Sequence, residues 1–287
     1  MKSLKVLLAL LLLPTAAFAG MNINGVSGLS EWYFHANFVE MRNSESGKLL
    51  YDWLDGEVFD EIREETGMNL GDDLNSLIAE SDGNDNVVVV FSGNIRQEYQ
   101  DQMMALMATQ NLDLAPRKSG GKTYYFTEGN GDTTQFNDGV FFSFDLKDKI
   151  VITSKEDKMQ EILANGANVV VRRANTLIMF SAKNDATGDG EMNGDWDSNI
   201  IQNTEEALVT ISDDAGKFRV QAELAMTTEE IADSMASVVR GLISLQAFND
   251  DIEPEISEVL SSTDVAVNGS TLSISLSVDA QTVVNEL

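Results

Sequence analysis

The feature that most constrains the fold is a hairpin pattern that occurs twice in the chain. Residues 77–94 form two apolar stretches around a polar turn, and residues 207–225 form two more around Asp213, Asp214 and Gly216. After the second turn, apolar and polar residues alternate, as expected of a strand with one buried and one solvent-facing side. Both segments therefore predict antiparallel strand pairs.

A helix is predicted after each of these hairpins. Apolar residues recur at helical spacing within 95–107 and again within 231–242. Asn94 is a candidate cap for the first helix, and Thr227 with Glu230 predicts a capping box for the second. The two segments thus share the order hairpin, then helix.

Another hairpin and a short helix follow in each case. Residues 139–163 contain the first such pair, and residues 265–287 contain the second. Asn268-Gly269 is a strong signal for the turn of the last hairpin.

Each half of the chain also opens with a candidate strand, at 31–38 and at 175–182. In the first half a helix over 41–66, ending at Gly67, connects this strand to the hairpin. The predicted fold is α+β: antiparallel sheet with helices on one face. We interpret the halves as duplicates in the order strand, connection, hairpin, helix, hairpin, helix. The alternative is that an α+β chain of this length shows this order by chance.

The N-terminus predicts export. Residues 1–19 combine two lysines, an apolar stretch and the sequence Ala-Phe-Ala before a cleavage site near Ala19, as in secretory signal peptides. We therefore expect a periplasmic or secreted protein whose two α+β halves span 20–168 and 169–287. No later stretch has the roughly 18 apolar residues that a transmembrane helix needs.

Charge and cysteine content exclude several classes of function. The formal charge is −28, and loss of two lysines with the signal peptide makes it −28 − 2 = −30. Such a surface repels nucleic acids and anionic lipids. It favours basic partners, such as another envelope protein, or solubility at high ionic strength. With no cysteine, disulfides and thiolate metal sites are excluded.

The single histidine, His35, limits the catalytic possibilities. Any Ser-His-Asp arrangement would need it. If Trp32, Phe34 and Ala36 form one face of a strand, His35 lies on the other, and we interpret it as a partly exposed structural residue. The chain contains no phosphate-binding loop or dinucleotide fingerprint, so no nucleotide cofactor is implied.

An acidic loop at 184–199 is the one candidate metal site. Oxygen ligands recur in it at intervals that resemble an EF-hand loop, although Ile200 replaces the distal glutamate. We expect weak calcium binding at best, because the bidentate carboxylate is missing. The candidate ligands are Asp189, Glu191, Asn193, Asp195 and Asp197.

The sequence thus favours an exported, non-catalytic binding or envelope-associated protein. The alternative is a carboxylate-dependent hydrolase of cell-wall sugars or peptides, since 47 acidic residues supply many candidate pairs. A weak calcium-binding protein is a minor alternative. No catalytic residue is singled out, and no cofactor other than calcium is implied.

Overall fold

The computed structural model describes residues 31–82, 86–109, 114–128, 139–167, 176–183, 203–247 and 259–287. They fall into two compact units. As far as it is described, the first unit contains residues 34–39 and 51–167, and the second contains 31–33, 40–50 and 176–287. The predicted boundary between residues 168 and 169 lies outside the described residues and stays a prediction.

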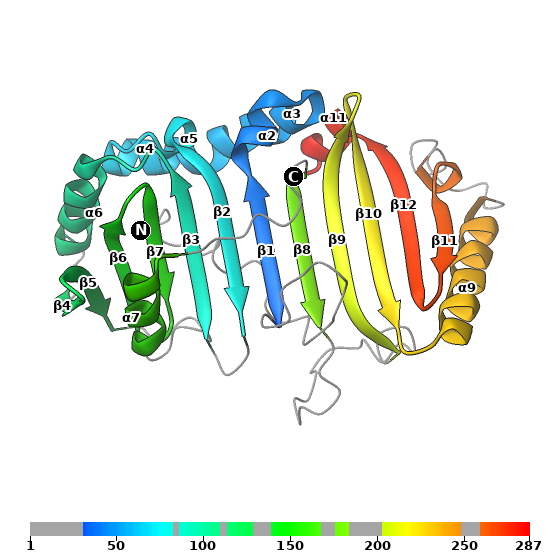
Figure 1. Ribbon diagram of the computed structural model, residues 1–287. Coiled ribbons are helices and arrows are strands. Elements are labelled where there is room, and N and C mark those ends of the chain that lie inside the picture. Colours follow the sequence, from blue (N-terminus) through cyan, green and yellow to red (C-terminus); the bar gives the residue numbers. More distant parts are fainter. Residues whose placement is uncertain are drawn as a thin grey trace. The chain divides into compact units, whose positions relative to one another are not determined.

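The first unit is an antiparallel sheet with helices, as the sequence predicts (Figure 1). Its sheet order is β1-β2-β3-β7-β6-β5-β4, and every neighbouring pair from β2 to β4 is antiparallel. The strands are β1 (Trp32–Asn37), β2 (Leu74–Ser81), β3 (Val87–Gly93), β4 (Ala115–Ser119), β5 (Lys122–Thr127), β6 (Val140–Leu146) and β7 (Lys149–Thr153). Of β1, residues 34–37 belong to this unit. The helices are α4 (Asp60–Thr66), α5 (Leu70–Asp73), α6 (Gln97–Thr109) and α7 (Glu156–Asn165).

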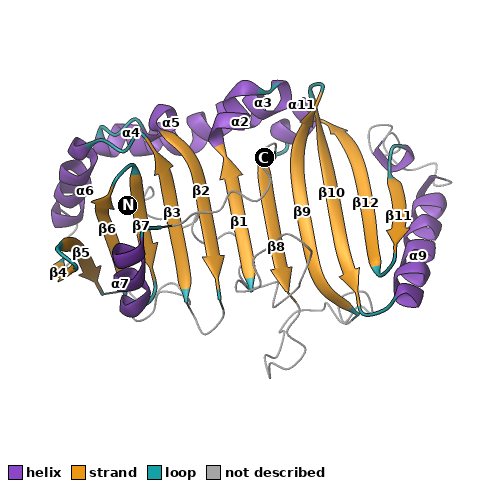
Figure 2. Cartoon of the chain, in the orientation of Figure 1, coloured by secondary structure: helices purple, strands orange, loops and turns teal. Residues whose placement is uncertain are grey.

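The second unit is also α+β, with the sheet order β8-β9-β10-β12-β11 (Figure 2). Neighbouring strands are antiparallel throughout. The strands are β8 (Ile178–Lys183), β9 (Thr204–Asp214), β10 (Lys217–Met226), β11 (Asp264–Asn268) and β12 (Thr271–Asp279), and the helices are α9 (Glu229–Ala247) and α11 (Ala280–Asn285).

The predicted hairpins are confirmed, with small shifts at their turns. Asp214 pairs with Lys217, so the two-residue turn between β9 and β10 is Ala215-Gly216. Asn268 pairs with Thr271, which moves the last turn one residue along from the predicted position, to Gly269 and Ser270. Gly269 has a positive φ of 57°, a conformation that glycine adopts without a steric cost.

The helix starts also differ from the predicted caps. Helix α9 begins one residue later than the capping box predicts, because Thr228 accepts a hydrogen bond from the backbone N–H of Ile231. The backbone of Thr227 instead donates to Asn203. Helix α6 begins at Gln97 rather than directly after Asn94.

The long helix predicted over 41–66 is a broken helical segment. It consists of α2 (Phe38–Asn43), α3 (Glu45–Leu54), a π-helical stretch (Asp55–Phe59) and α4. Gly67 ends it with a positive φ of 74°, as predicted. Residues 40–50 belong to the second unit, where Asp213 accepts hydrogen bonds from the backbone and side chain of Ser46 at 2.7 and 2.6 Å.

The β4–β5 hairpin was not predicted. Its strands pair from Ala115 with Phe126 to Ser119 with Lys122, around a Gly120-Gly121 turn in which both φ angles are positive. The strands are only five and six residues long, and β4 carries three polar or charged residues and a proline, so its pattern is weak.

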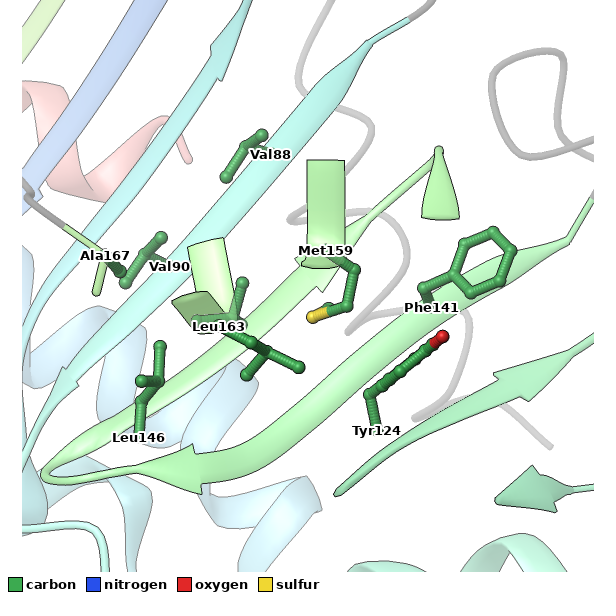
Figure 3. Packing of buried hydrophobic residues seen from close by; sticks show 9 residues of the cluster. Val88, Val90, Tyr124, Phe141, Leu146, Met159, Leu163 and Ala167 are labelled. Atoms are coloured by element: carbon green, nitrogen blue, oxygen red, sulfur yellow. The ribbon is translucent and has the colours of Figure 1, made fainter. Parts of the chain in front are cut away.

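One helix packs against the sheet in each unit. In the first unit Met159 and Leu163 of α7 pack against Val88, Val151 and Phe141 of the sheet (Figure 3). In the second unit, α9 packs against β10, β11 and β12; the buried members of this cluster are Met226, Ala232, Ala236, Val265 and Leu272. Helix α5 instead leads directly into β2.

Candidate binding pocket

A buried carboxylate fixes the chain at the start of helix α6. Asp73, only 5% exposed, lies at the junction of α5 and β2. Its side chain accepts hydrogen bonds from the Tyr99 hydroxyl, from Asn94 Nδ2 at 3.0 Å and from the Arg96 guanidinium. Its carbonyl accepts one from the Asn94 backbone at 2.7 Å. The segment 94–99 is therefore held by one aspartate.

These contacts shift the pKa values of Asp73 and Tyr99 in the directions that preserve the hydrogen bond between them. Burial alone would raise the pKa of Asp73, but the hydrogen bonds from Tyr99, Asn94 and Arg96 outweigh it and lower the pKa below its ordinary value. Burial and the neighbouring Asp73 raise the pKa of Tyr99 to about 12. At neutral pH the aspartate is ionised and the tyrosine keeps its proton.

Arg96 is the exposed member of this cluster. Its guanidinium lies 3.0 Å from Asp73 Oδ2 and 3.4 Å from Glu98 Oε1, and its side chain is 47% exposed. The guanidinium carbon lies 5.7 Å from the centre of the Tyr99 ring. Since a buried anion and an aromatic ring hold it, Arg96 presents a positioned cation to solvent.

Arg96 lines an open pocket of about 380 Å³ in the first unit. The pocket is formed by the segment leading into α6 and by the end of β6 with the turn that follows it. Three lining residues are apolar and the others are charged or carry an amide. The lining residues are Ile95, Arg96, Gln97, Gln100, Phe144, Asp145, Leu146, Lys147 and Asp148.

The β6–β7 turn supplies charges of both signs to the pocket. Leu146 pairs with Lys149, which leaves Lys147 and Asp148 as the two turn residues. Asp148 has a positive φ of 59°, and its carbonyl accepts a hydrogen bond from the Gly93 backbone at 3.1 Å. The turn is therefore tied to β3, the strand that leads to Arg96.

Asp145 is the third charged residue on this side of the pocket. Its carboxylate accepts a hydrogen bond from the backbone of Thr123, and its own backbone N–H donates to Ser143 Oγ at 3.2 Å. On the opposite side, Gln100 donates to the Tyr125 hydroxyl at 3.5 Å. Strand β5 thus holds one residue on each side of the pocket.

The lining groups can hold a charged or polar ligand. The pocket has cationic and amide donors, carboxylate acceptors and a small apolar surface. Its described lining contains no hydroxyl, thiol or imidazole group that could act as a nucleophile beside a base.

A second polar cluster in the first unit fastens the extra hairpin. Arg117 of β4 lies 2.5 Å from Glu156 of α7, and Tyr124 of β5 donates to the same carboxylate at 2.7 Å. The hydrogen bonds from Arg117 and Tyr124 lower the pKa of Glu156. The Arg117 guanidinium also lies 4.8 Å from the centre of the Phe126 ring. This cluster lies within the packed hairpin and serves its anchoring.

The interpretation of His35 as partly exposed is wrong. His35 and Tyr33 are each 1% exposed, whereas Trp32 and Phe34 on the alternate face are only partly buried. The apolar pattern suggested the opposite because the aromatic residues of β1 lie on both faces. Burial lowers the pKa of His35, so it is neutral at pH 7.

The predicted calcium ligands lie outside the described residues. These are Asp189, Glu191, Asn193, Asp195 and Asp197. Within the described part of the chain, no group of three or more histidine, aspartate or glutamate side chains is placed to hold a metal ion. The expectation of weak calcium binding therefore stays a prediction.

Sequence reasoning missed the pocket. Arg96 precedes a helix and Lys147-Asp148 forms a turn much later in the chain, so no local spacing connects them. The one available signal was the short polar turn between two apolar strands, which predicts a hairpin but not what the hairpin faces.

Comparisons with known proteins place the fold. No family model matches the chain, and no curated protein matches its sequence. Three crystal structures of the protein TP0453 do match in structure. Crystal form III has a TM-score of 0.51 at 11% identity, and the match covers 92% of this chain and 97% of that one. Crystal form I has a TM-score of 0.50 at 11% identity, and the match covers 92% of this chain and 96% of that one. Crystal form IV has a TM-score of 0.51 at 13% identity, covering 94% of this chain and 97% of its own.

The chain is similar in fold to TP0453. At this level of identity, the likeness concerns the fold and carries no ligand or activity. It supports the α+β assignment over nearly the whole of both chains. Among the helices that the structure describes, none is long and apolar enough to cross a bilayer.

Proposed function

We propose that this protein is an exported, non-catalytic binding protein of the cell envelope, and that its ligand occupies the Arg96 pocket. The observation that carries the proposal is the fixed guanidinium of Arg96, which a buried carboxylate positions at the wall of an open pocket. Export follows from the signal-peptide pattern of residues 1–19. The protein's large negative charge is the reason to exclude nucleic acids as partners.

The sequence-based alternative, a carboxylate-dependent hydrolase, receives less support. A glycosidase acid must hold its proton near neutral pH, which requires a raised pKa. The pKa values of Asp73, Glu156 and Asp213 are lowered instead. Burial alone would raise each of them, but the hydrogen bonds to each carboxylate outweigh the effect of burial. These groups act as acceptors that hold the structure.

We also infer that the two units arose by duplication. Without the β4–β5 hairpin, the order β1-β2-β3-β7-β6 corresponds to β8-β9-β10-β12-β11. A helix follows the second hairpin strand in both units, and a second helix follows the last strand. In this correspondence the turn Lys147-Asp148, which lines the pocket, is equivalent to Gly269-Ser270 in the second unit.

Fractionation and native mass spectrometry test the proposed function. We expect the full-length precursor to yield a mature protein in the exported fraction, with a mass that fits cleavage after Ala19. The protein purified gently from this fraction should carry a small-molecule adduct, and a Lys147→Gln/Asp148→Gly double variant should lose it. A precursor that stays in the cytoplasm, or an adduct that the double variant retains, would contradict the proposal.

A further inference from the structure

We propose that the Arg96 pocket recognises a small zwitterion, either a free amino acid or a dipeptide with unblocked ends. The inference rests on the proposed function, in that it assumes the pocket to be the ligand site. The structure brings cations and carboxylates to the wall of one small pocket. A ligand with both an anionic and a cationic end satisfies both sets of charges.

The cationic side of the pocket suits a carboxylate. A guanidinium has five N–H donors. Arg96 uses one donor for Asp73 and one for Glu98, so further donors can bind a ligand. Its position is set by Asp73, so little conformational entropy is lost when a carboxylate binds. Lys147 lies on the β6–β7 turn with its Nζ 3.8 Å from Asp148 Oδ2, so Arg96 is the cation that we expect to receive the carboxylate.

The anionic side suits an ammonium group. Asp145 is anchored through Thr123, and Asp148 extends from a turn that is tied to Gly93. The left-handed conformation of Asp148 is one that glycine adopts more easily, and glycine residues with positive φ occur in the β4–β5 and β11–β12 turns. Aspartate also tolerates this conformation, and the turn places its carboxylate on the wall of the pocket.

The size and apolar surface of the pocket limit the ligand further. About 380 Å³ lies at the low end of the range for small-molecule sites, roughly 300–1,000 Å³. Ile95 and Phe144 provide apolar contact for one side chain. A neutral sugar has no carboxylate to accept the remaining N–H donors of Arg96, and a simple anion would be repelled by the two carboxylates.

Saturation-transfer NMR on the full mature protein tests the charge requirement. The probes are an equimolar mixture of free amino acids and unblocked dipeptides, the same mixture N-acetylated and C-amidated, and the neutral disaccharide N,N′-diacetylchitobiose. We expect transfer to members of the unblocked mixture and at least a tenfold weaker affinity for their blocked forms. Equal transfer to the blocked peptides, transfer to the disaccharide alone, or transfer to none of the probes would overturn the inference.

A matched pair of variants assigns the site. Asp148→Gly should weaken binding of the best dipeptide at least tenfold in calorimetry, with a thermal midpoint that is unchanged or raised. Ala215→Gly replaces another non-glycine residue with positive φ, in the β9–β10 turn of the second unit, and should leave affinity unchanged. Dipeptide binding that survives Asp148→Gly, or that Ala215→Gly weakens equally, would contradict the assignment.

The failures of the two proposals are distinguishable. If native mass spectrometry finds an adduct that depends on Lys147 and Asp148, but no dipeptide binds, then the pocket is a ligand site and the zwitterion class is wrong. If the double variant retains the adduct, the pocket itself is not the ligand site.

Discussion

Two hairpin–helix–hairpin modules share a strand order but differ in what lies between their elements: the first module is residues 73–165 and the second is residues 204–285. In the first, buried Asp73 and partly buried Glu156 collect hydrogen bonds from tyrosine and arginine. In the second, the cluster beneath α9 consists of apolar side chains. The shared order therefore does not depend on the polar clusters.

The polar clusters of the first module instead position additional parts. The Asp73 cluster fixes Arg96 at the pocket, and the Glu156 cluster fixes the β4–β5 hairpin, which the second module lacks. Strand β5 in turn holds Asp145 and Gln100 at the pocket walls. The shared topology therefore follows from the apolar pattern. The two features that the first module adds, the Arg96 segment and the β4–β5 hairpin, each have a polar anchor.

Removing the Asp73 carboxylate should have the largest effect. Asp73→Ala leaves the Tyr99 hydroxyl and the Arg96 guanidinium without their buried acceptor, which should cost about 3 kcal/mol of unfolding free energy. Urea denaturation measures the loss. A loss below about 1 kcal/mol would mean that the cluster is as dispensable as a surface ion pair.

A smaller loss of unfolding free energy is expected from a substitution in residues 40–50, which pack in the second unit. A Cβ atom at Gly47 would lie 2.8 Å from the Leu177 side chain and 2.8 Å from the Met41 Cα, so Gly47→Ala should destabilise the protein by about 2 kcal/mol. Gly56→Ala is the matched control, since no atom lies within 4 Å of its added Cβ. Equal unfolding midpoints for the two variants would contradict the packing of this segment.

The helix cap at the end of the second module should contribute less. Asp279 accepts a hydrogen bond from the Thr282 backbone at 2.9 Å at the start of α11. Asp279→Ala removes this cap and should cost about 1 kcal/mol, measured by the same denaturation. Asp279→Ser retains an acceptor and should restore most of the loss; a serine variant no better than alanine would argue against capping.

The smallest expected effect is in the acid dependence of stability. The pKa of Asp73 is lower in the folded protein than in the unfolded chain, where it is about 3.9. At pH values between the folded and the unfolded pKa, the unfolded state therefore binds more protons than the folded state. The stabilisation from Asp73 is thus present above the unfolded pKa and is lost as the pH falls through the folded pKa. Thermal midpoints measured from pH 6 to pH 3 should fall more steeply for the wild type than for Asp73→Asn. Parallel curves would show that other carboxylates dominate.

The sequence was informative where local pattern decides the structure. Four hairpins and the helices after them follow from apolar periodicity, and Gly67 ends its helix as predicted because glycine tolerates the left-handed conformation. The start of α9 moved by one residue, because the neighbouring residues Thr227 and Thr228 offer equivalent acceptors. The start of α6 moved by two residues, from 95 to Gln97.

Features that depend on distant residues could not be read from the sequence. His35 looked half-exposed because period-two alternation assigns it to one face, whereas β1 has buried residues on both faces. The pocket joins Arg96 to the Lys147-Asp148 turn through the pairing of β3 with β7, and no single window of sequence contains that pairing. The β4–β5 hairpin was missed because its anchor, Glu156, lies on a later helix.

Hydrogen–deuterium exchange of the full mature protein, with and without a saturating mixture of unblocked dipeptides, tests the central claim most directly. We expect added protection in the segments 95–100 and 144–149, which line the pocket of the first module, and none in the corresponding turn of the second module at 268–271. Protection confined to the second module would contradict the proposal that the first module alone carries the ligand site, and unchanged exchange at 95–100 and 144–149 would contradict a dipeptide as its ligand.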